Sequence, residues 1–266
     1  MMKKLVLALS AVAALTAPAL AADLAPRPYT KAPLPVAAVV NWTGCYVGGG
    51  GGYGLWNQEN TGFVQDGANS ARIQTTETAT AGGRGYFGTV QGGCDYQFAL
   101  GTYNLVVGAF GDYDFASMKG KLNLPDSIFF GDEKMSSAWA VGGRIGWLVT
   151  PNLLTYFSGG YTQATFDRTD FHLNLLPPPI AFIDKQTYKG YFIGAGDEYA
   201  LNFLPGLFWK TEYRFSQFDT ERVALRNIQF PGGFATSTYD SKKWVQTIRS
   251  ELVYRFNWGG PVVAKY

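Results

Sequence analysis

The sequence predicts an all-β fold: an eight-stranded antiparallel transmembrane β-barrel with four long surface loops. Three observations predict it. The chain begins with an export signal, it is poor in charge but rich in aromatic residues and glycine, and its strand-like segments are joined by connections that alternate between long and short. Each observation is compatible with other folds, but their combination is typical of a sheet that closes in a membrane.

The first 21 residues have the organisation of a signal peptide. Lys3 and Lys4 form a basic head, Leu5–Leu20 is apolar and uncharged, and Ala19-Leu20-Ala21 supplies the small-x-small pattern of a cleavage site. We expect cleavage after Ala21, with Ala22 as a one-residue alternative. A retained membrane helix is disfavoured because the run is short for a span of ~20 residues and contains Pro18. The protein is therefore expected in the outer membrane.

Composition restricts the partners. Of 22 Lys and Arg residues two lie in the signal, so the mature chain carries 20 basic and 20 acidic residues and has no basic field for a nucleic acid. Charged and aromatic residues each make up 16% of the chain, and 33 of 266 residues are glycine. This composition suits a sheet with one face in lipid. The expected partners are outer-membrane lipid and lipopolysaccharide.

Four segments follow from these patterns: a signal peptide (1–21), a Pro-rich periplasmic linker (22–40), a β-barrel (41–256) and a C-terminal tail (257–266). Eight strands are predicted within the barrel: Asn41–Trp56, Gly82–Phe98, Tyr103–Ser117, Ser136–Val149, Leu154–Phe166, Thr187–Ala200, Leu207–Phe218 and Ser241–Phe256.

The connections between these strands set the orientation. Those after strands one, three, five and seven are long and polar, whereas Ala99–Thr102, Thr150–Leu153 and Leu201–Gly206 are short. Tight turns on one side and long loops on the other are the outer-membrane pattern, with both termini in the periplasm. A soluble β-sandwich also alternates apolar and polar residues, and it remains the main alternative fold.

Alternation within the last two strands assigns charged residues to the barrel interior. In strand seven, Trp209 and Tyr213 share one face and Lys210 and Glu212 the other. Antiparallel register places Lys210 opposite Glu198 and Glu251 and places Glu212 opposite Arg249, and Asp112 and Arg144 are expected to come close. The predicted interior charge network comprises Asp112, Arg144, Glu198, Lys210, Glu212, Arg249 and Glu251.

Two interpretations of this network remain. The charges could line a polar pore, or they could form a plug of salt bridges. Eight strands enclose a space that side chains alone can fill, which favours the plug.

Cys45 and Cys94 are expected near the same rim, on the outward faces of strands one and two. The register that joins them also pairs Val47 with Gly92 and Tyr53 with Tyr86. Direct cross-strand partners are close enough for a disulfide, and the periplasm would oxidise the pair. Two unlinked, lipid-facing thiols are the alternative.

The last strand ends on the outward pair Tyr254 and Phe256, and Pro261 disfavours a continuous strand to the C-terminus. Terminal-strand aromatics of this kind resemble the signal read by the barrel-assembly machinery, which is therefore an expected partner during biogenesis.

Other motifs carry little chemistry. Gly49-x-Gly51-x-x-Gly54 formally fits a dinucleotide pattern, but a polar loop follows it instead of a helix. His172 is the sole histidine, and no spacing ties it to Ser158 or Ser216 as a nucleophile. No catalytic, cofactor or metal site is predicted. Six of the seven tryptophans fall near a predicted rim, where such rings anchor at the membrane interface.

Five segments resemble the outer-membrane surface-antigen (outer-membrane immunogenic protein) family of alphaproteobacteria, small barrels of the OmpA-like type. The segments are ALAADL at the signal, NWTGCYVGGGGGYG (Asn41–Gly54), AWAVGGRIGW (Ala138–Trp147), IGAGDEYAL (Ile193–Leu201) and LVYRFNWGGPVVAKY (Leu252–Tyr266). The resemblance implies an eight-stranded barrel with a structural or antigenic role. The chain departs from the family at Cys45 and Cys94, at Phe110, where an acid is common, and at Asp197, which would face lipid.

The leading functional hypothesis is a structural, surface-exposed outer-membrane protein with an antigenic or membrane-integrity role and no catalysis. A narrow pore for small solutes, a barrel enzyme and loop-mediated binding of a host or environmental ligand are the alternatives. A blocked interior would favour the structural and loop-binding hypotheses, and a continuous passage would favour the pore.

Overall fold

The computed structural model describes residues 40–64, 71–123, 129–173, 178–228 and 237–256, and within these ranges every regular element is a strand. The strands are β1 (Gly44–Val64), β2 (Ile73–Gln74), β3 (Ala79–Leu100), β4 (Tyr103–Asn123), β5 (Phe129–Thr150), β6 (Leu153–Phe166), β7 (Thr169–Leu173), β8 (Ala181–Ile183), β9 (Gln186–Ala200), β10 (Leu207–Phe218), β11 (Glu221–Ala224), β12 (Arg226–Asn227) and β13 (Ser237–Phe256).

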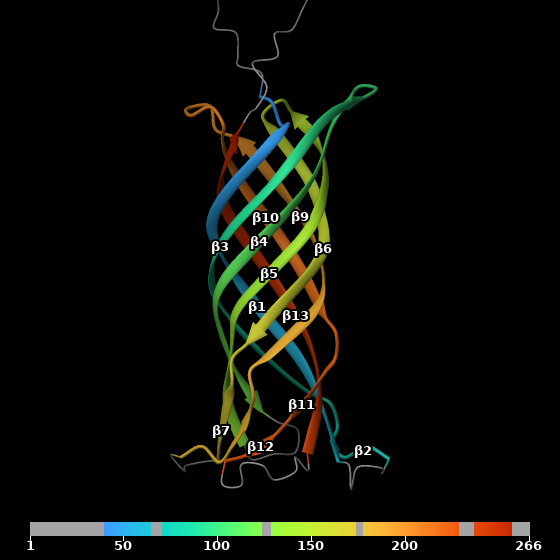
Figure 1. Ribbon diagram of the computed structural model, residues 1–266, viewed down its shortest axis with the longest axis vertical. Coiled ribbons are helices and arrows are strands. Elements are labelled where there is room, and N and C mark those ends of the chain that lie inside the picture. Colours follow the sequence, from blue (N-terminus) through green and yellow to red (C-terminus); the bar gives the residue numbers. More distant parts are fainter. Residues whose placement is uncertain (1–39, 65–70, 124–128, 174–177, 229–236, 257–266) are drawn as a thin grey trace, which may run out of the picture. The chain divides into compact units, whose positions relative to one another are not determined.

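Eight long strands close into a barrel (Figure 1). Around the ring β1 pairs with β3, β3 with β4, β4 with β5 and β5 with β6; β6 then pairs with β9, β9 with β10, β10 with β13, and β13 returns to β1. Every pairing is antiparallel, so each strand has two hydrogen-bonded neighbours and the ring has no free edge. The eight-stranded antiparallel barrel predicted from the sequence is confirmed, and the sandwich is excluded.

Most strands are longer than the alternation predicted. β1, β3, β4, β5 and β13 have 20 to 22 residues, about twice the ~9–11 that a tilted strand needs to cross a bilayer. β4 and β5 run past the predicted ends at Ser117 and Ser136, and this shortens their connection to residues 124–128. The sheet thus continues well beyond a membrane-sized band, and β7, β8, β11 and β12 extend it at the same end.

The two ends of the barrel differ, as the connection lengths predicted, although the β4–β5 connection is shorter than expected. The hairpins β3–β4, β5–β6 and β9–β10 turn at one end, where Gly101 and Gly206 adopt positive φ, and the first and last described residues lie there too (Figure 1). Trp42 donates from Nε1 to the Pro151 carbonyl in the β5–β6 turn, and the Arg255 N–H donates to Gly206 in the β9–β10 turn. We call this end the short-turn end.

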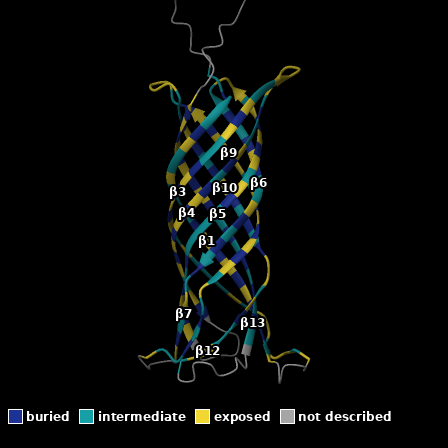
Figure 2. Cartoon of the chain, viewed as in Figure 1, coloured by how far each residue is buried: buried dark blue, intermediate teal, exposed yellow. Residues whose placement is uncertain are grey.

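The two faces of the wall alternate along every long strand (Figure 2). On β13, Ile248, Leu252 and Tyr254 are exposed on the outer face, whereas Arg249 and Glu251 are buried inside. Charged and polar groups therefore share the interior with aromatic and aliphatic side chains, whereas apolar side chains cover the outside, which is unlike the surface of a soluble protein. The described residues include no helix long and apolar enough to cross a membrane.

The predicted signal peptide (1–21), nearly all of the linker (22–40) and the tail (257–266) lie outside the described residues, and these segments remain predictions. The same holds for Trp258 among the predicted rim tryptophans.

Candidate functional site

The barrel interior is the candidate site because it concentrates charged groups that water does not reach. Its side chains come from alternate positions of the eight long strands, such as Lys210, Glu212 and Arg214 on β10. These charges form three clusters, which we call the short-turn cluster, the central cluster and the far cluster.

The short-turn cluster is a closed ring of two arginines and two carboxylates. Arg144 of β5 bonds to Asp95 of β3 and, over 2.8 Å, to Glu198 of β9. Arg255 of β13 bonds to the same two acids, at 2.6 Å to Asp95 and 2.7 Å to Glu198. All four side chains are at most 1% exposed. Four strands are thereby joined across the lumen, and the charge of the ring is balanced.

Aromatic rings enclose this cluster. Both guanidinium groups lie 4.9 Å from the centre of the Tyr46 ring, and Arg255 also lies over Trp42 and Phe208. Cation–π contacts of this kind gain strength where water is excluded. Trp42 and Trp56 are fully buried inside the barrel, so the prediction that they anchor at a membrane rim is wrong. Trp42 lies next to the start of β1, as expected, but Trp56 lies well inside that strand, and the inward orientation of both residues was not considered.

The central cluster combines three cations with four acids. Its members are Asp112, Asp114, Lys210, Glu212, Arg214, Arg249 and Glu251. Arg214 grips Asp112 with two hydrogen bonds of 2.9 and 3.0 Å and also bonds to Glu212. Arg249 donates to Asp114 over 3.0 Å. Bidentate arginine–carboxylate bonds fix geometry as well as charge, so this layer is a rigid crosslink.

Lys210 bridges the remaining acids of the central cluster. Its Nζ lies 3.5 Å from Glu212 and 3.9 Å from Glu251, and it donates to Gln91 over 2.7 Å. The Gln91 amide donates in turn to Glu251. Every member of this chain of contacts is buried.

The far cluster is a single pair. Lys243 of β13 donates to both oxygens of Glu133 on β5, at 2.8 and 3.0 Å. Its ammonium group also lies 4.2 Å from the ring centre of Phe166 and near the rings of Trp56 and Tyr188. This layer is mostly aromatic and closes the lumen beyond the central cluster.

Glycines on the inner face of β1 make room for these layers. Gly50 and Gly52 lie where the chain would otherwise project side chains into the lumen. A Cβ on Gly50 would come within 2.1 Å of the Ser250 carbonyl oxygen, and one on Gly52 would meet the Phe87 ring at 2.5 Å. The run of glycines that formally resembled a nucleotide motif is therefore one continuous strand, and its missing side chains admit neighbouring ones.

A small cavity lies between the central cluster and the aromatic layer. It has a volume of about 20 Å³, and its lining includes Asp114, Thr247 and Arg249. Each of these contributes a buried polar atom without a protein partner. The space suits about one water molecule with several polar partners. The interior is thus packed by side chains and is no open passage at this level.

The register places the predicted pairs as expected. Lys210 lies opposite Glu198 on β9 and Glu251 on β13, and Glu212 lies opposite Arg249. Lys210 forms the predicted ion pair with Glu251, at 3.9 Å, but the other ion pairs involve different partners. Glu212 contacts Arg214 and Lys210, while Arg249 reaches Asp114 and Asp112 across the lumen.

The predicted proximity of Asp112 and Arg144 is wrong. Asp112 lies opposite Ala140 and binds Arg214 and Arg249, whereas Arg144 lies opposite Gly108 and binds Asp95 and Glu198. The sequence analysis compared neighbouring strands, but long side chains in a narrow barrel reach strands that are not neighbours. Six interior charges were therefore missed as members of the clusters: Asp95, Asp114, Glu133, Arg214, Lys243 and Arg255.

The two cysteines lie opposite each other in the β1–β3 register and are joined by a disulfide. The same register pairs Val47 with Gly92 and brings the rings of Tyr53 and Tyr86 to 4.9 Å. The sequence left open a disulfide or two unlinked thiols, and the structure contains the disulfide.

Two other predicted features lie on the outer wall. Tyr254 and Phe256 end β13 with their ring centres 5.3 Å apart and both side chains exposed. Asp197 faces outward on β9, where it accepts a 2.6 Å hydrogen bond from the Thr155 hydroxyl. The register of this strand is regular through Asp197, so its charge is accommodated by a neighbouring hydroxyl and not by a shift of the strand.

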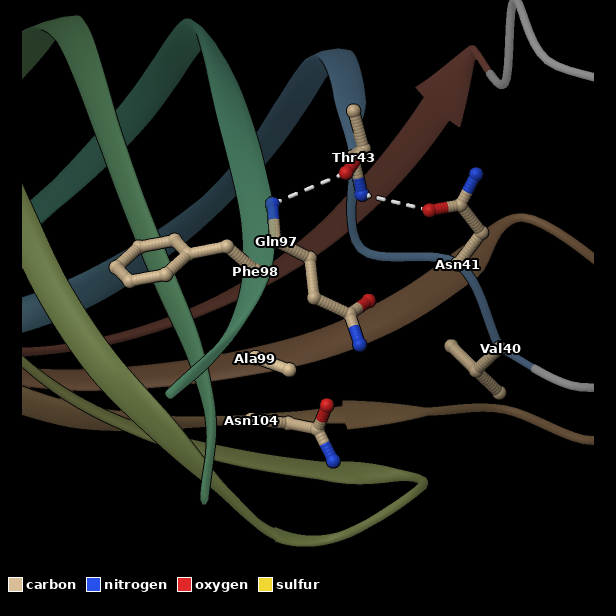
Figure 3. Close-up of a pocket in the computed structure, with 7 residues that line it drawn as sticks. All are labelled: Val40, Asn41, Thr43, Gln97, Phe98, Ala99 and Asn104. Carbon is tan, nitrogen blue, oxygen red and sulfur yellow. Dashed lines mark hydrogen bonds between the residues drawn. The ribbon is translucent and has the colours of Figure 1, made fainter. Parts of the chain in front are cut away.

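A hollow of about 400 Å³ opens at the short-turn end (Figure 3). The chain before β1 and the β3–β4 hairpin line it. The Gln97 N–H donates to the Thr43 hydroxyl over 3.0 Å, the Thr43 N–H donates to the Asn41 side chain, and the Trp42 N–H donates to the Gln97 side chain. These polar groups form hydrogen bonds with one another, and the bonds fix the path of the chain into β1.

A second hollow lies at the opposite end, on the extension formed by β4, β5 and β7. It measures about 460 Å³, and its lining includes Lys121, Asp132, Arg168, Asp170 and His172. Ser158 and Ser216 are buried inside the barrel, on strands other than the one that carries His172. Among the described residues no cluster of histidine, cysteine and acidic side chains is suited to a metal ion.

An eight-stranded ring with no free edge, an apolar outer wall and a charged interior defines a transmembrane β-barrel of the outer-membrane type. No family model matches the sequence, and no curated protein matches it. The solved structures to which the barrel is similar include three outer-membrane proteins, none more than 12% identical to it.

The first is the outer membrane protein OprG from Pseudomonas aeruginosa, at 11% identity over 82% of this chain and 100% of that chain, with a TM-score of 0.43. The second is the attachment invasion locus protein Ail of Yersinia pestis, at 12% identity over 77% of this chain and 99% of that chain, with a TM-score of 0.31. The third is the outer membrane protease OmpT from Escherichia coli, at 12% identity over 79% of this chain and 97% of that chain, with a TM-score of 0.37. The class assignment rests on the geometry of this barrel itself.

Proposed function

We propose that this chain is a structural, surface-exposed outer-membrane protein whose lumen is plugged. The observation that carries the proposal is the short-turn cluster, in which Arg144, Arg255, Asp95 and Glu198 bond to one another across the barrel with almost no exposure. A solute would have to break these charge-assisted bonds to pass. Leaving one member of a buried ion pair without its partner costs about 3–5 kcal/mol, and this cost opposes opening of the lumen at equilibrium.

The proposed steps of export and membrane insertion follow from the sequence. The signal peptide is cleaved near Ala21 or Ala22, the barrel-assembly machinery reads the terminal pair Tyr254 and Phe256, and the barrel inserts with its termini in the periplasm. The motifs at Asn41–Gly54 and Leu252–Tyr266 support membership of the alphaproteobacterial surface-antigen family. The role is then to hold lipid and lipopolysaccharide around a rigid wall and to present the long connections outside.

Single-channel recording of the refolded full chain in planar bilayers tests the plug. We expect no discrete conductance steps from the wild type. A variant in which both arginines of the ring are shortened, Arg144→Ser/Arg255→Ser, should also give none while its heat-modifiable migration shows a folded barrel, because the central and far clusters still close the lumen. Steady conductance by the wild type would refute the plug and favour the narrow pore.

The second hollow, on the extension formed by β4, β5 and β7, supports a second candidate function, which is the binding of a ligand. It is about 460 Å³ in volume, and its lining includes the cations Lys121 and Arg168 and the acids Asp132 and Asp170. Mixed charge around a hollow suits a polar partner. A screen of host and environmental glycans and proteins on wild-type cells, compared with cells that carry Lys121→Ala/Arg168→Ala, tests this candidate.

A further inference from the structure

Three cations lie side by side on the outer wall of the barrel. The register places Arg84 of β3 directly opposite Lys119 of β4, and Lys119 directly opposite Lys134 of β5. Arg84 and Lys119 are exposed, and the Lys134 side chain is 38% exposed. We call these three residues the cation row. Like charges directly opposite each other on neighbouring strands destabilise a sheet, so the row has an intrinsic cost.

Acidic neighbours compensate the row incompletely. Lys134 lies 3.9 Å from an Asp167 oxygen, and Asp132 lies opposite Lys121, one outward position beyond Lys119. Arg84 faces Leu55 on its other side, and it and Lys119 take part in none of the ion pairs formed by the described residues. Two of three adjacent cations are thus left facing outward without a carboxylate.

The position of the row along the barrel is the second observation. Tyr86, two residues from Arg84 toward the short-turn end, is 73% exposed, and Phe115, four residues from Lys119 in the same direction, is 62% exposed. Exposed aromatic rings form the girdles of transmembrane barrels at the membrane interface. The cation row therefore lies just beyond the girdle, on the side of the long connections.

We propose that Arg84, Lys119 and Lys134 bind the phosphate group of a phosphorylated lipid in the outer leaflet. This inference rests on the proposed placement of the barrel in the outer membrane. Guanidinium binds phosphate with two parallel hydrogen bonds, and ammonium groups add point charges. The phosphate removes the repulsion within the row, while the exposed side chains of Leu55, Tyr86 and Phe115 contact the acyl chains of the same lipid.

Native mass spectrometry of the refolded full chain, titrated with lipid A that carries both phosphates, tests the site. Arg84→Gln/Lys119→Gln should bind this lipid about tenfold more weakly than the wild type, because two charge-assisted contacts are lost. The matched control is Lys189→Gln/Lys242→Gln, which removes the same charge from outward positions on β9 and β13 that belong to no row. The control should retain wild-type affinity.

Thermal unfolding in neutral detergent gives a readout that a merely structural role would not produce. Without lipid, Lys119→Gln should have a higher Tm than the wild type, since it removes the repulsion of Lys119 by Arg84 and by Lys134. With bisphosphorylated lipid A the order should reverse. With dephosphorylated lipid A, Lys119→Gln should keep the higher Tm, because no phosphate neutralises the row. Inorganic phosphate should bind far more weakly than the lipid because it has no acyl chains.

The outcomes separate this inference from the plug. Equal affinity of the wild type and Arg84→Gln/Lys119→Gln for bisphosphorylated lipid A would overturn the site, even if the barrel is folded and does not conduct. An equal loss in the control variant would also overturn it, since any surface charge would then suffice. Inorganic phosphate binding as tightly as the lipid would assign the row to a free anion. Conductance by the wild type refutes the plug but leaves the lipid result unaffected.

Discussion

Arg144 shares two acids with Arg255, so its removal would leave Asp95 and Glu198 with a single cation in a space closed to water. We expect Arg144→Met to lower the free energy of unfolding of the refolded barrel by about 3–5 kcal/mol. Arg168→Met, which removes an exposed partner of Asp170, should change it by no more than about 0.5 kcal/mol. Urea titration in detergent micelles measures both.

A double variant checks that the effect comes from charge balance and not from lost packing. Arg144→Met/Asp95→Asn leaves Arg255 paired with Glu198. It should therefore be more stable than the sum of the two single losses predicts. Strict additivity would show that the ring acts as independent contacts.

The disulfide between Cys45 and Cys94 has a separation of 49 residues in sequence. On the chain-entropy account, closing such a loop stabilises the folded state by roughly 4 kcal/mol. Cys45→Ser/Cys94→Ser should accordingly unfold at lower urea concentration, and the wild type should do the same under reducing conditions. Labelling of the denatured, unreduced wild type with a thiol reagent should find no free thiol; two labelled cysteines would contradict the bridge.

The position of a residue relative to another could be predicted where the two lie directly opposite each other on adjacent strands. Parity and register alone put Lys210 between Glu198 and Glu251 and put Cys45 beside Cys94. For Asp112 and Arg144 the register between β4 and β5 was misjudged, since Asp112 lies opposite Ala140 and Arg144 lies opposite Gly108. Parity and register also carry no information on reach across the lumen, so the actual partners of these two residues were not predicted. The signal available was the inward parity of Arg214 and Arg255, which marks them as interior charges without naming their partners.

At the scale of the strand, β1 tolerates no side chain at its inner glycines. Gly50→Ala would bring the new methyl group against the backbone of β13, which cannot move without opening the closing pair of the barrel. Overpacking of this kind costs about 1–3 kcal/mol. Gly88→Ala on β3 points outward, and its methyl group would approach the Gly50 carbonyl oxygen no closer than 3.9 Å.

We therefore expect a lower Tm for Gly50→Ala and a wild-type Tm for Gly88→Ala, measured by heat-modifiable migration on gels. Equal effects of the two substitutions would mean that backbone entropy, not interior space, selects glycine on these strands.

Variants at the end of β13 can distinguish an assembly signal from ordinary contact with lipid. Tyr254→Ser/Phe256→Ser removes one outward aromatic pair, and Tyr113→Ser/Phe115→Ser removes another of similar exposure on β4, with ring centres 4.8 Å apart. If the terminal pair is read during assembly, its loss should reduce insertion in cells far more than its loss reduces refolding into detergent in vitro. The β4 variant should change both equally. Normal insertion of the terminal variant would refute the signal.

Strand number and order were predictable because period-two alternation and turn residues are local properties of the chain. Strand ends were not. Beyond Ser117 the β4 sequence is polar on its outer face, which reads as a loop, yet Leu122 points inward and joins a buried cluster with Phe171 and Tyr239. Pairing with neighbours that also extend past the membrane keeps these polar segments in the sheet.

For the whole molecule, the asymmetry of the two ends is the property that determines orientation. Three short hairpins and the first and last described residues share one end, and β2, β7 and β12 lie at the other (Figure 1). Cells fold such barrels with short turns in the periplasm and long connections outside. If the barrel is oriented in this way, as we propose, the ring of Arg144 and Arg255 lies toward the periplasm and the cation row lies toward the cell surface.

Site-directed labelling of intact cells tests that orientation. In a Cys45→Ser/Cys94→Ser background, Gln74→Cys places a thiol on β2, and Asn202→Cys places one in the β9–β10 turn; both positions are exposed. A maleimide carrying a polymer too large to cross the outer membrane should label the first variant in intact cells and the second after the membrane is permeabilised. Both should be labelled equally in detergent, which controls for reactivity. Labelling of Asn202→Cys in intact cells would invert the barrel and, with it, the leaflet assigned to the cation row.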